Sequence, residues 1–228
     1  MESKTLGWLA AVELMLVALW VIMLVPYSAN AGEIATLDDA VALVDDPGAL
    51  YYPTYINAVL FTVGATVFMV GLYTTLQGDA PVWTLVGVMF VPVYALCNLF
   101  AYASQITVVP ALVDVYESDP DAELLLGQMV QMWPDSVVAF INGLGYAVLG
   151  IPSIIFGAVL YQKHPVFRAA GALLAASGVA SIVGIAGMVV GSDALMMGTL
   201  IGGLVFLIAL IALTWSLFRP ASAPVPAG

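Results

Sequence analysis

Basic residues, histidine and cysteine are scarce in this chain of 228 residues, which holds only four lysines and arginines, one histidine and one cysteine. The single cysteine, Cys97, excludes an intramolecular disulfide and a metal cluster held by several thiolates. The single histidine, His164, excludes a multi-histidine metal site and a haem bound by two histidines of one chain. Fifteen acidic residues oppose the four basic ones, and such a surface repels nucleic-acid phosphates. We therefore expect no metal, no cofactor and no nucleic-acid partner.

Motifs of common enzyme classes are also missing. The chain contains neither an HExxH zinc-protease motif nor a GxSxG nucleophile elbow. No lysine lies within an apolar segment, where it could form a Schiff base. Glycine-rich stretches such as GIAGMVVG lie in apolar segments and do not follow a strand, so they are not phosphate-binding loops. His164, between Lys163 and Pro165, is expected to be a solvated turn residue. We expect that the protein is not an enzyme.

Apolar residues dominate what is present. The chain is 63% hydrophobic and 8% charged, with a mean hydropathy of +1.08, whereas soluble domains are about 25% charged. Six apolar segments are each long enough to cross a hydrocarbon core of about 30 Å. The fold class that this predicts is an all-α transmembrane bundle of six spans with up-down topology, forming one domain over 1–219 and followed by a disordered tail at 220–228. The predicted spans are 6–27, 54–77, 82–105, 136–162, 168–191 and 194–218.

The few basic residues predict the orientation. With six spans, Lys4, Lys163, Arg168 and Arg219 all fall on one side of the membrane, which the positive-inside rule makes the cytoplasmic side. We expect a multi-pass protein of the plasma membrane with both termini in the cytoplasm and two long acidic loops outside. The small-x-small triplet 29–31 resembles a signal-peptidase site. A retained first helix is favoured, because the apolar run is longer than the apolar region of a typical signal sequence and is interrupted by Glu13.

The two long outer loops each carry a helix-start signal. Thr36 is expected to cap a short helix whose first turn contains Asp38 and Asp39. Asp119 followed by Pro120 is the sequence of a cap residue and a first helical residue. The apolar residues after Pro120, among them Leu124 and Leu125, predict a helix lying in the membrane interface.

Polar residues form stripes at one depth of the predicted bundle. Because residues three or four apart share a helix face, the third and fourth spans each present such a stripe, and the second span adds one amide at similar depth. One interpretation is an outward-facing crevice that binds a small-molecule or lipid-like ligand. The other, which we favour, is hydrogen bonding between helices. The candidate ligand-binding residues are Asn57, Tyr94, Asn98, Tyr102, Gln105, Asn142 and Tyr146, with Pro92 and Pro152 as candidate helix hinges.

Glu13 is the one carboxyl group well inside a predicted span. No lysine or arginine lies in the interior of any span, since Arg168 is the first residue of the fifth, so a deeply buried ion pair is excluded. A proton-handling carboxyl group is one interpretation. A structural carboxyl group hydrogen-bonded to a hydroxyl of Ser153, Tyr73 or Ser177 is the other. The structural interpretation is favoured, because a proton relay usually contains more than one titratable group.

Small residues mark the fifth and sixth spans. Ser177 and Ser181, Gly187 and Gly191, and Gly198 and Gly202 are small-xxx-small pairs, which allow helix backbones to approach closely. We expect these two helices to pack tightly. Formation of a homodimer through one of these glycine-rich faces is the alternative.

Residues 98–190 resemble a group of uncharacterised prokaryotic membrane proteins with six spans and a domain of unknown function. The resemblance is carried by three stretches: NLFAYASQITVVPAL, WPDSVVAFINGLGYAVLGIPSIIFGAVL and FRAAGALLAASGVASIVG. The acidic loops and the scarce basic residues depart from the pattern of that family. The resemblance implies six helices and no established activity.

Three functions remain as hypotheses. A binding or sensory module with a crevice open to the outside is the first, with membrane lipid around it and a small or lipid-like ligand within. A small proton-coupled transporter with Glu13 as its proton site and Pro92 and Pro152 as gates is the second. The third is a structural subunit of a membrane complex that uses its glycine-rich faces, which a Gly198→Leu variant would disrupt.

Overall fold

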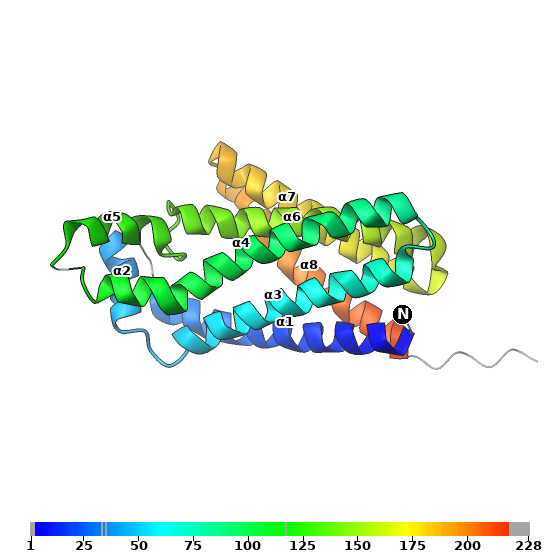
Figure 1. Ribbon diagram of the computed structural model, residues 1–228, viewed down its shortest axis with the longest axis horizontal. Coiled ribbons are helices and arrows are strands. Elements are labelled where there is room, and N and C mark those ends of the chain that lie inside the picture. Colours follow the sequence, from blue (N-terminus) through cyan, green and yellow to red (C-terminus); the bar gives the residue numbers. More distant parts are fainter. Residues whose placement is uncertain (1–2, 33, 35, 117, 219–228) are drawn as a thin grey trace, which may run out of the picture.

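The computed structural model describes residues 3–32, 34, 36–116 and 118–218, and these residues form helices and loops without a strand. Six long helices are apolar enough to cross a membrane (Figure 1). The predicted fold class, an all-α transmembrane bundle, is thereby confirmed, and the chain is a multi-pass membrane protein. The six helices are α1 (Ser3–Ala31), α3 (Tyr51–Leu76), α4 (Pro81–Val113), α6 (Val137–Lys163), α7 (Arg168–Val190) and α8 (Asp193–Phe218).

The six long helices are arranged as a ring. Each long helix packs mainly against the long helices that precede and follow it in the chain. The first and last, α1 and α8, also pack against each other, and this contact closes the ring. Contacts across the ring are few. A ring of six helices with little contact across its centre leaves room for an internal cavity.

The two ends of the ring differ. At one end, called the capped end here, lie the short helices α2 (Leu37–Asp45) and α5 (Pro120–Met129). At the other, called the terminal end, lie the start of α1, the turn between α3 and α4, and the short 3-10 helix η1 (Pro165–Phe167). Asp79 and His164 join two turns at the terminal end through an Oδ2–Nε2 distance of 2.8 Å. His164 is partly exposed, as expected for a turn residue, and its ring nitrogen has the carboxylate of Asp79 as a partner.

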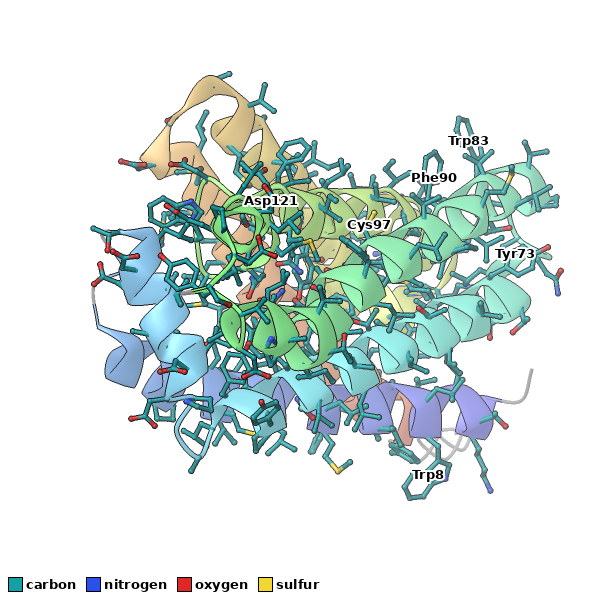
Figure 2. The ribbon with its side chains drawn as sticks, turned by 60° about the vertical axis from the view of Figure 1, so that its left-hand side comes forward. Trp8, Tyr73, Trp83, Phe90, Cys97 and Asp121 are labelled. Carbon is teal, nitrogen blue, oxygen red and sulfur yellow. The ribbon has the colours of Figure 1, made fainter. Side chains whose placement is uncertain are left out.

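The ring closes where α1 meets the end of α8. Gly7 lies against Leu217 and Phe218, and the Trp8 and Phe218 rings contact edge to face with centroids 5.4 Å apart. The start of α8 lies with α7, away from α1 (Figure 1). Trp8 and Trp83 project outward near the terminal end (Figure 2), as aromatic residues of a membrane interface do.

The capped end confirms the expected helix caps. The Thr36 side chain accepts from the Asp39 N–H at 3.2 Å and the Asp39 carboxylate accepts from the Thr36 N–H at 2.8 Å, a reciprocal capping box. Pro120 occupies the first turn of α5 after the Asp119 cap. Tyr116 donates a 2.6 Å hydrogen bond to Asp38, and this bond raises the pKa of Tyr116 to about 12. The bond ties the loop after α4 to α2.

Two predicted spans are clearly shorter than the helices that form, and the first of them was expected over 6–27, whereas α1 covers Ser3–Ala31. The third span was expected to end at residue 105, whereas α4 continues through Pro110 to Val113. Hydropathy marks the part of a helix that suits lipid. The helix α4 extends past this apolar part, and it contacts the short helices α2 and α5. Glu33, Glu117, Arg219 and the predicted tail at 220–228 lie outside the described residues.

Tight packing through small residues is confirmed for α7 and α8, and it extends to α6. A Cβ at Gly198 would lie 2.6 Å from the Ala180 carbonyl oxygen, and one at Gly150 would lie 2.6 Å from the Gly178 carbonyl oxygen. These distances show that the backbones of α7 and α8, and those of α6 and α7, are in direct contact. Of the glycines considered for a dimer interface, Gly187, Gly198 and Gly202 are therefore covered within the chain, whereas a Cβ at Gly191 would meet no atom within 4 Å. Gly198→Leu would disrupt the fold itself.

Gly171→Ala tests the contact of α6 with α7. Its Cβ would lie 2.6 Å from the Gly157 carbonyl oxygen and 2.8 Å from the Tyr161 nitrogen, so the helices must separate. We expect the free energy of unfolding in mixed micelles to fall by about 1–3 kcal/mol, as for other overpacked sites. Gly203→Ala is the matched control, because its Cβ would meet no atom within 4 Å. Equal effects of the two substitutions would contradict the close contact.

Candidate functional site

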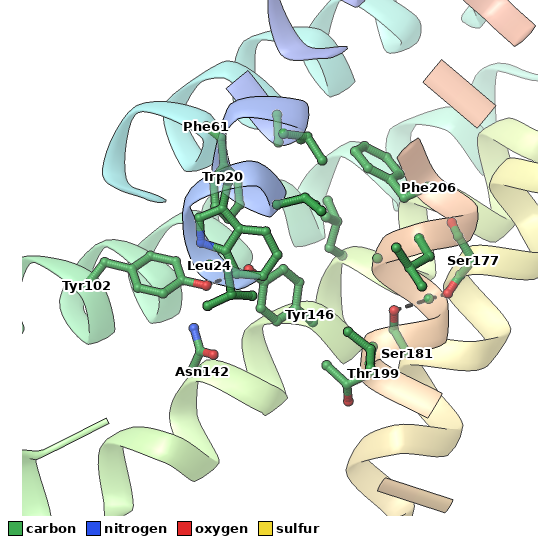
Figure 3. Close-up of a pocket in the computed structure, with 18 of the residues that line it drawn as sticks. Trp20, Leu24, Phe61, Tyr102, Asn142, Tyr146, Ser177, Ser181, Thr199 and Phe206 are labelled. Atoms are coloured by element: carbon green, nitrogen blue, oxygen red, sulfur yellow. Dashed lines mark hydrogen bonds between the residues drawn. The ribbon is translucent and has the colours of Figure 1, made fainter. Parts of the chain in front are cut away.

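A cavity of about 550 Å³ lies inside the helix ring (Figure 3). All six long helices contribute side chains to it, and so does the loop after α5. It extends from Gln131 and Met132 at the capped end to Glu13 and Ala65 near the middle of α1 and α3. Its volume is within the range of ligand pockets, about 300–1,000 Å³. The predicted crevice between the second, third and fourth spans is thus corrected to a cavity that all six long helices line, with the exposed side chains of Val25 and Leu204 among its lining residues.

Aromatic and aliphatic side chains make up most of the cavity wall. Trp20 of α1 and Phe61 of α3 contact edge to face with centroids 5.4 Å apart, and Phe61 contacts Tyr102 of α4 in the same way at 5.8 Å. Phe206 of α8 lines the wall opposite, beyond Leu24 of α1. Such a wall suits an apolar ligand body.

A polar cluster on α4 and α6 interrupts this apolar wall. Tyr102 and Tyr146 share a hydrogen bond between their hydroxyls, and Asn142 lies beside them (Figure 3). Asn142 donates to the Asn98 Oδ1 at 2.7 Å, and Gln131 donates to the Asn142 Oδ1 at 3.4 Å. The side-chain amide of Asn142 is therefore held in one orientation by partners behind it.

Small hydroxyl residues form a second polar patch, between α7 and α8. Ser177, Ser181 and Thr199 line the cavity there, on the side away from Asn142 (Figure 3). Ser181 donates to the Ser177 carbonyl oxygen at 3.0 Å. From the sequence, Ser177 and Ser181 were expected only to allow close packing of helices. Both also line the cavity, and the small-xxx-small spacing of the sequence does not reveal this second role.

Glu13 is the unusual member of the wall. Its side chain is 0% exposed, and neither carboxyl oxygen has a hydrogen-bond partner. One of these oxygens lies where a Cβ at Gly64 of α3 would be, so the missing side chain of Gly64 makes room for the carboxyl group. The nearby Tyr94 hydroxyl also lacks a partner. Tyr27 and Thr54 also line the cavity with hydroxyls that have no partner, so four buried polar side chains of the wall are unsatisfied among the described residues.

The expectation that a hydroxyl of Ser153, Tyr73 or Ser177 would hydrogen-bond Glu13 is wrong, because neither carboxyl oxygen has a partner among the described residues. Ser153 donates to the Leu149 carbonyl oxygen at 2.8 Å and Ser177 to the Leu174 carbonyl oxygen at 2.7 Å. Serine in a helix commonly bonds to a carbonyl of the preceding turn, and here that bond takes the only proton each hydroxyl can donate. Both serines line the same cavity as Glu13 without donating to it.

Three of the seven candidate ligand-binding residues do not line the cavity. Asn57 donates to the Leu16 carbonyl oxygen at 2.9 Å and joins α3 to α1. Gln105 donates to the Met129 carbonyl oxygen at 2.9 Å and accepts from the Gln131 N–H at 3.0 Å, which holds the loop after α5. Asn98 supports Asn142. The favoured interpretation, that the polar stripes form hydrogen bonds between elements of the bundle, thus describes Asn57, Gln105 and Asn98. The other four candidates line the cavity: Tyr94, Tyr102, Asn142 and Tyr146.

The two candidate hinges lie within unbroken helices. Pro92 is in α4 and Pro152 is in α6, beside the cavity residues Gly150 and Ser153. A proline removes one helix hydrogen bond, but both helices continue through it. A gating role stays a prediction.

Comparisons with protein-family models, with curated proteins and with solved structures found no match. The resemblance of residues 98–190 to an uncharacterised six-span family therefore stays a prediction, and the function rests on the geometry of the site.

A double-mutant cycle tests the contact of Glu13 with Gly64. Gly64→Ala forces the carboxyl group to move, so we expect it to destabilise the wild-type chain more than a Glu13→Ala chain. The difference should be about 0.5–3 kcal/mol, the usual coupling between residues in contact. Unfolding in mixed micelles measures it. A cycle of Gly203→Ala with Glu13→Ala is the control and should be additive, whereas additivity at Gly64 would refute the contact.

Proposed function

We propose that the protein is a binding or sensory module of the plasma membrane whose cavity holds one small amphipathic or lipid-like molecule. The observation that carries this proposal is the cavity itself: about 550 Å³ inside a ring of six helices, with a largely apolar wall and a few oriented polar groups. Proteins hold ligands in pockets of this size and composition. Structural hydrogen bonding alone would explain Asn57 and Gln105, but it does not explain an unpartnered carboxyl group facing a cavity.

The proposed orientation places the capped end outside the cell. Lys4, Lys163 and Arg168 lie at the terminal end, and the positive-inside rule assigns that end to the cytoplasm. The cavity occupies the half of the bundle nearer the capped end, so a ligand would enter from the outer side or from the outer leaflet.

Filling the cavity tests the proposal. Gly203 lies on the same face of α8 as the cavity residues Met196, Thr199 and Leu200, and a Cβ there meets no atom within 4 Å. A helical side chain leans toward the preceding turn, so the ring of a Gly203→Phe variant would enter the cavity. We expect native mass spectrometry of protein released gently from its own membranes to show a discrete adduct that this variant lacks.

Ile208→Phe is the matched control, because Ile208 lies on the outer face of α8, half exposed and away from the cavity. This variant should retain the adduct. A bare mass for the wild-type protein, or an adduct that Gly203→Phe retains, would overturn the proposal. A mass that includes a second kind of chain would favour a structural subunit instead.

A small proton-coupled transporter is the second candidate, and the burial of Glu13 beside the cavity favours it. A carboxyl group inside a membrane protein is costly and commonly serves ion or proton movement. In liposomes carrying a pH gradient, this function predicts proton flux with the wild-type protein and none with Glu13→Gln. Equal flux in both, or none in either, would exclude it. Glu123→Gln, on the exposed face of α5, is the control.

A further inference from the structure

We propose that the ligand of this cavity is an amphipathic organic cation whose charged group binds between Glu13 and the surrounding aromatic rings. The inference rests on the proposed function and names the chemical class of the ligand. It starts from a carboxyl group that is 0% exposed, has no hydrogen-bond partner and faces a cavity.

No lysine or arginine of the described residues lies beside Glu13. The lysines and arginines of the described residues are Lys4, Lys163 and Arg168, all at the terminal end of the bundle, whereas Glu13 lies against Gly64 in the middle of α3. Burying an unpaired carboxylate is costly, and a positive charge beside it offsets that cost, as does uptake of a proton. Since none of the described side chains hydrogen-bonds Glu13, a cation in the cavity would find its carboxyl group unpaired.

Aromatic side chains around the carboxyl group favour a cation over a neutral donor. Tyr94 and Tyr146 lie close enough to Glu13 to interact with it electrostatically, and Trp20, Phe61 and Tyr102 line the adjoining wall. The faces of such rings attract ammonium groups, most strongly where water is excluded. A carboxyl group and several aromatic rings in the wall of one cavity form a site for a quaternary or alkylated amine.

The remainder of the wall suits the apolar part of such a ligand. Leu24, Leu149, Leu204 and Phe206 line the cavity without offering a hydrogen bond. The serine hydroxyls in this wall direct their protons to carbonyls of their own helix, so they present oxygen lone pairs to the cavity. Lone pairs and carboxylates both disfavour an anionic ligand.

Charge at the capped end gives an independent reason for a cation. Asp38, Asp39 and Asp45 lie in α2, and Asp121 and Glu123 lie in α5, while no lysine or arginine of the described residues lies at that end. The cavity reaches this end at Gln131 and Met132. A negative field at the mouth of a low-dielectric cavity concentrates cations there and repels anions.

Two probes of the same shape separate charge from size. Trimethylphenylammonium and tert-butylbenzene differ by a nitrogen in place of a carbon and therefore by one positive charge. Equilibrium dialysis against the protein in phosphatidylcholine nanodiscs, with empty nanodiscs as background, measures the affinity of each probe. We expect the wild-type protein to bind the cation at least about tenfold more tightly than the neutral probe, the discrimination of a desolvated cation–π and ion-pair site.

Glu13→Gln should remove this preference, because glutamine keeps the shape of the side chain and loses its charge. Affinity for tert-butylbenzene should stay unchanged, which also shows that the variant is folded. Glu123→Gln removes one charge from exposed α5 and should leave both affinities within a factor of about two, as expected for a screened surface charge.

The remaining outcomes are distinct. Equal binding of both probes, abolished by Gly203→Phe, would overturn the cationic ligand and leave the proposed function standing. A preference for the cation that Glu13→Gln retains would overturn the role of Glu13. If neither probe binds the wild-type protein above the nanodisc background, the cationic ligand is excluded, and the native mass spectrum decides the proposed function separately.

Discussion

Backbone contact between α6, α7 and α8 is the constraint on which the rest of the bundle depends. Lipid gives helices little hydrophobic reason to associate, so association relies on close packing and on polar contacts. Gly157 against Gly171 and Gly184 against Thr199 bring main chains together over much of the length of these helices. Three helices held this closely form a rigid half of the ring, and the positions of α4 and α1, which pack against its two edges, follow from it.

The other half of the ring packs through large side chains, and this difference accounts for the cavity. Trp20, Phe61 and Tyr102 join α1, α3 and α4 through edge-to-face contacts and line the cavity, because aromatic rings meet edge to face and do not interdigitate like small residues. The polar groups of the wall are held from behind, as Asn98 holds Asn142. The cavity is therefore surrounded by fixed elements and has a defined shape before any ligand enters.

Local chemistry in the sequence predicted local structure well. The six apolar segments, the Thr36 cap and the Asp119–Pro120 helix start each depend on a few neighbouring residues, and the structure contains them all. The cavity depends instead on which helices become neighbours. Tyr94 and Asn98 share one predicted face, yet only Tyr94 lines the cavity. The pairing of Glu13 with Gly64 requires the register of α1 on α3, for which the spacing of residues within either helix carries no information.

The state of Glu13 connects stability with function. A carboxyl group kept only for packing would be expected to find a donor, since an unsatisfied buried polar group lowers stability by about 1–3 kcal/mol. Ser153 and Ser177 lie on the same cavity, but their protons are used within their own helices, and Gly64 leaves the space that the carboxyl group occupies. Among the described residues, the protein thus retains an acceptor, makes room for it and provides no hydrogen-bond partner. Such an arrangement lowers stability by itself and becomes favourable when a donor enters the cavity, which is the energetic pattern that the proposed binding function requires.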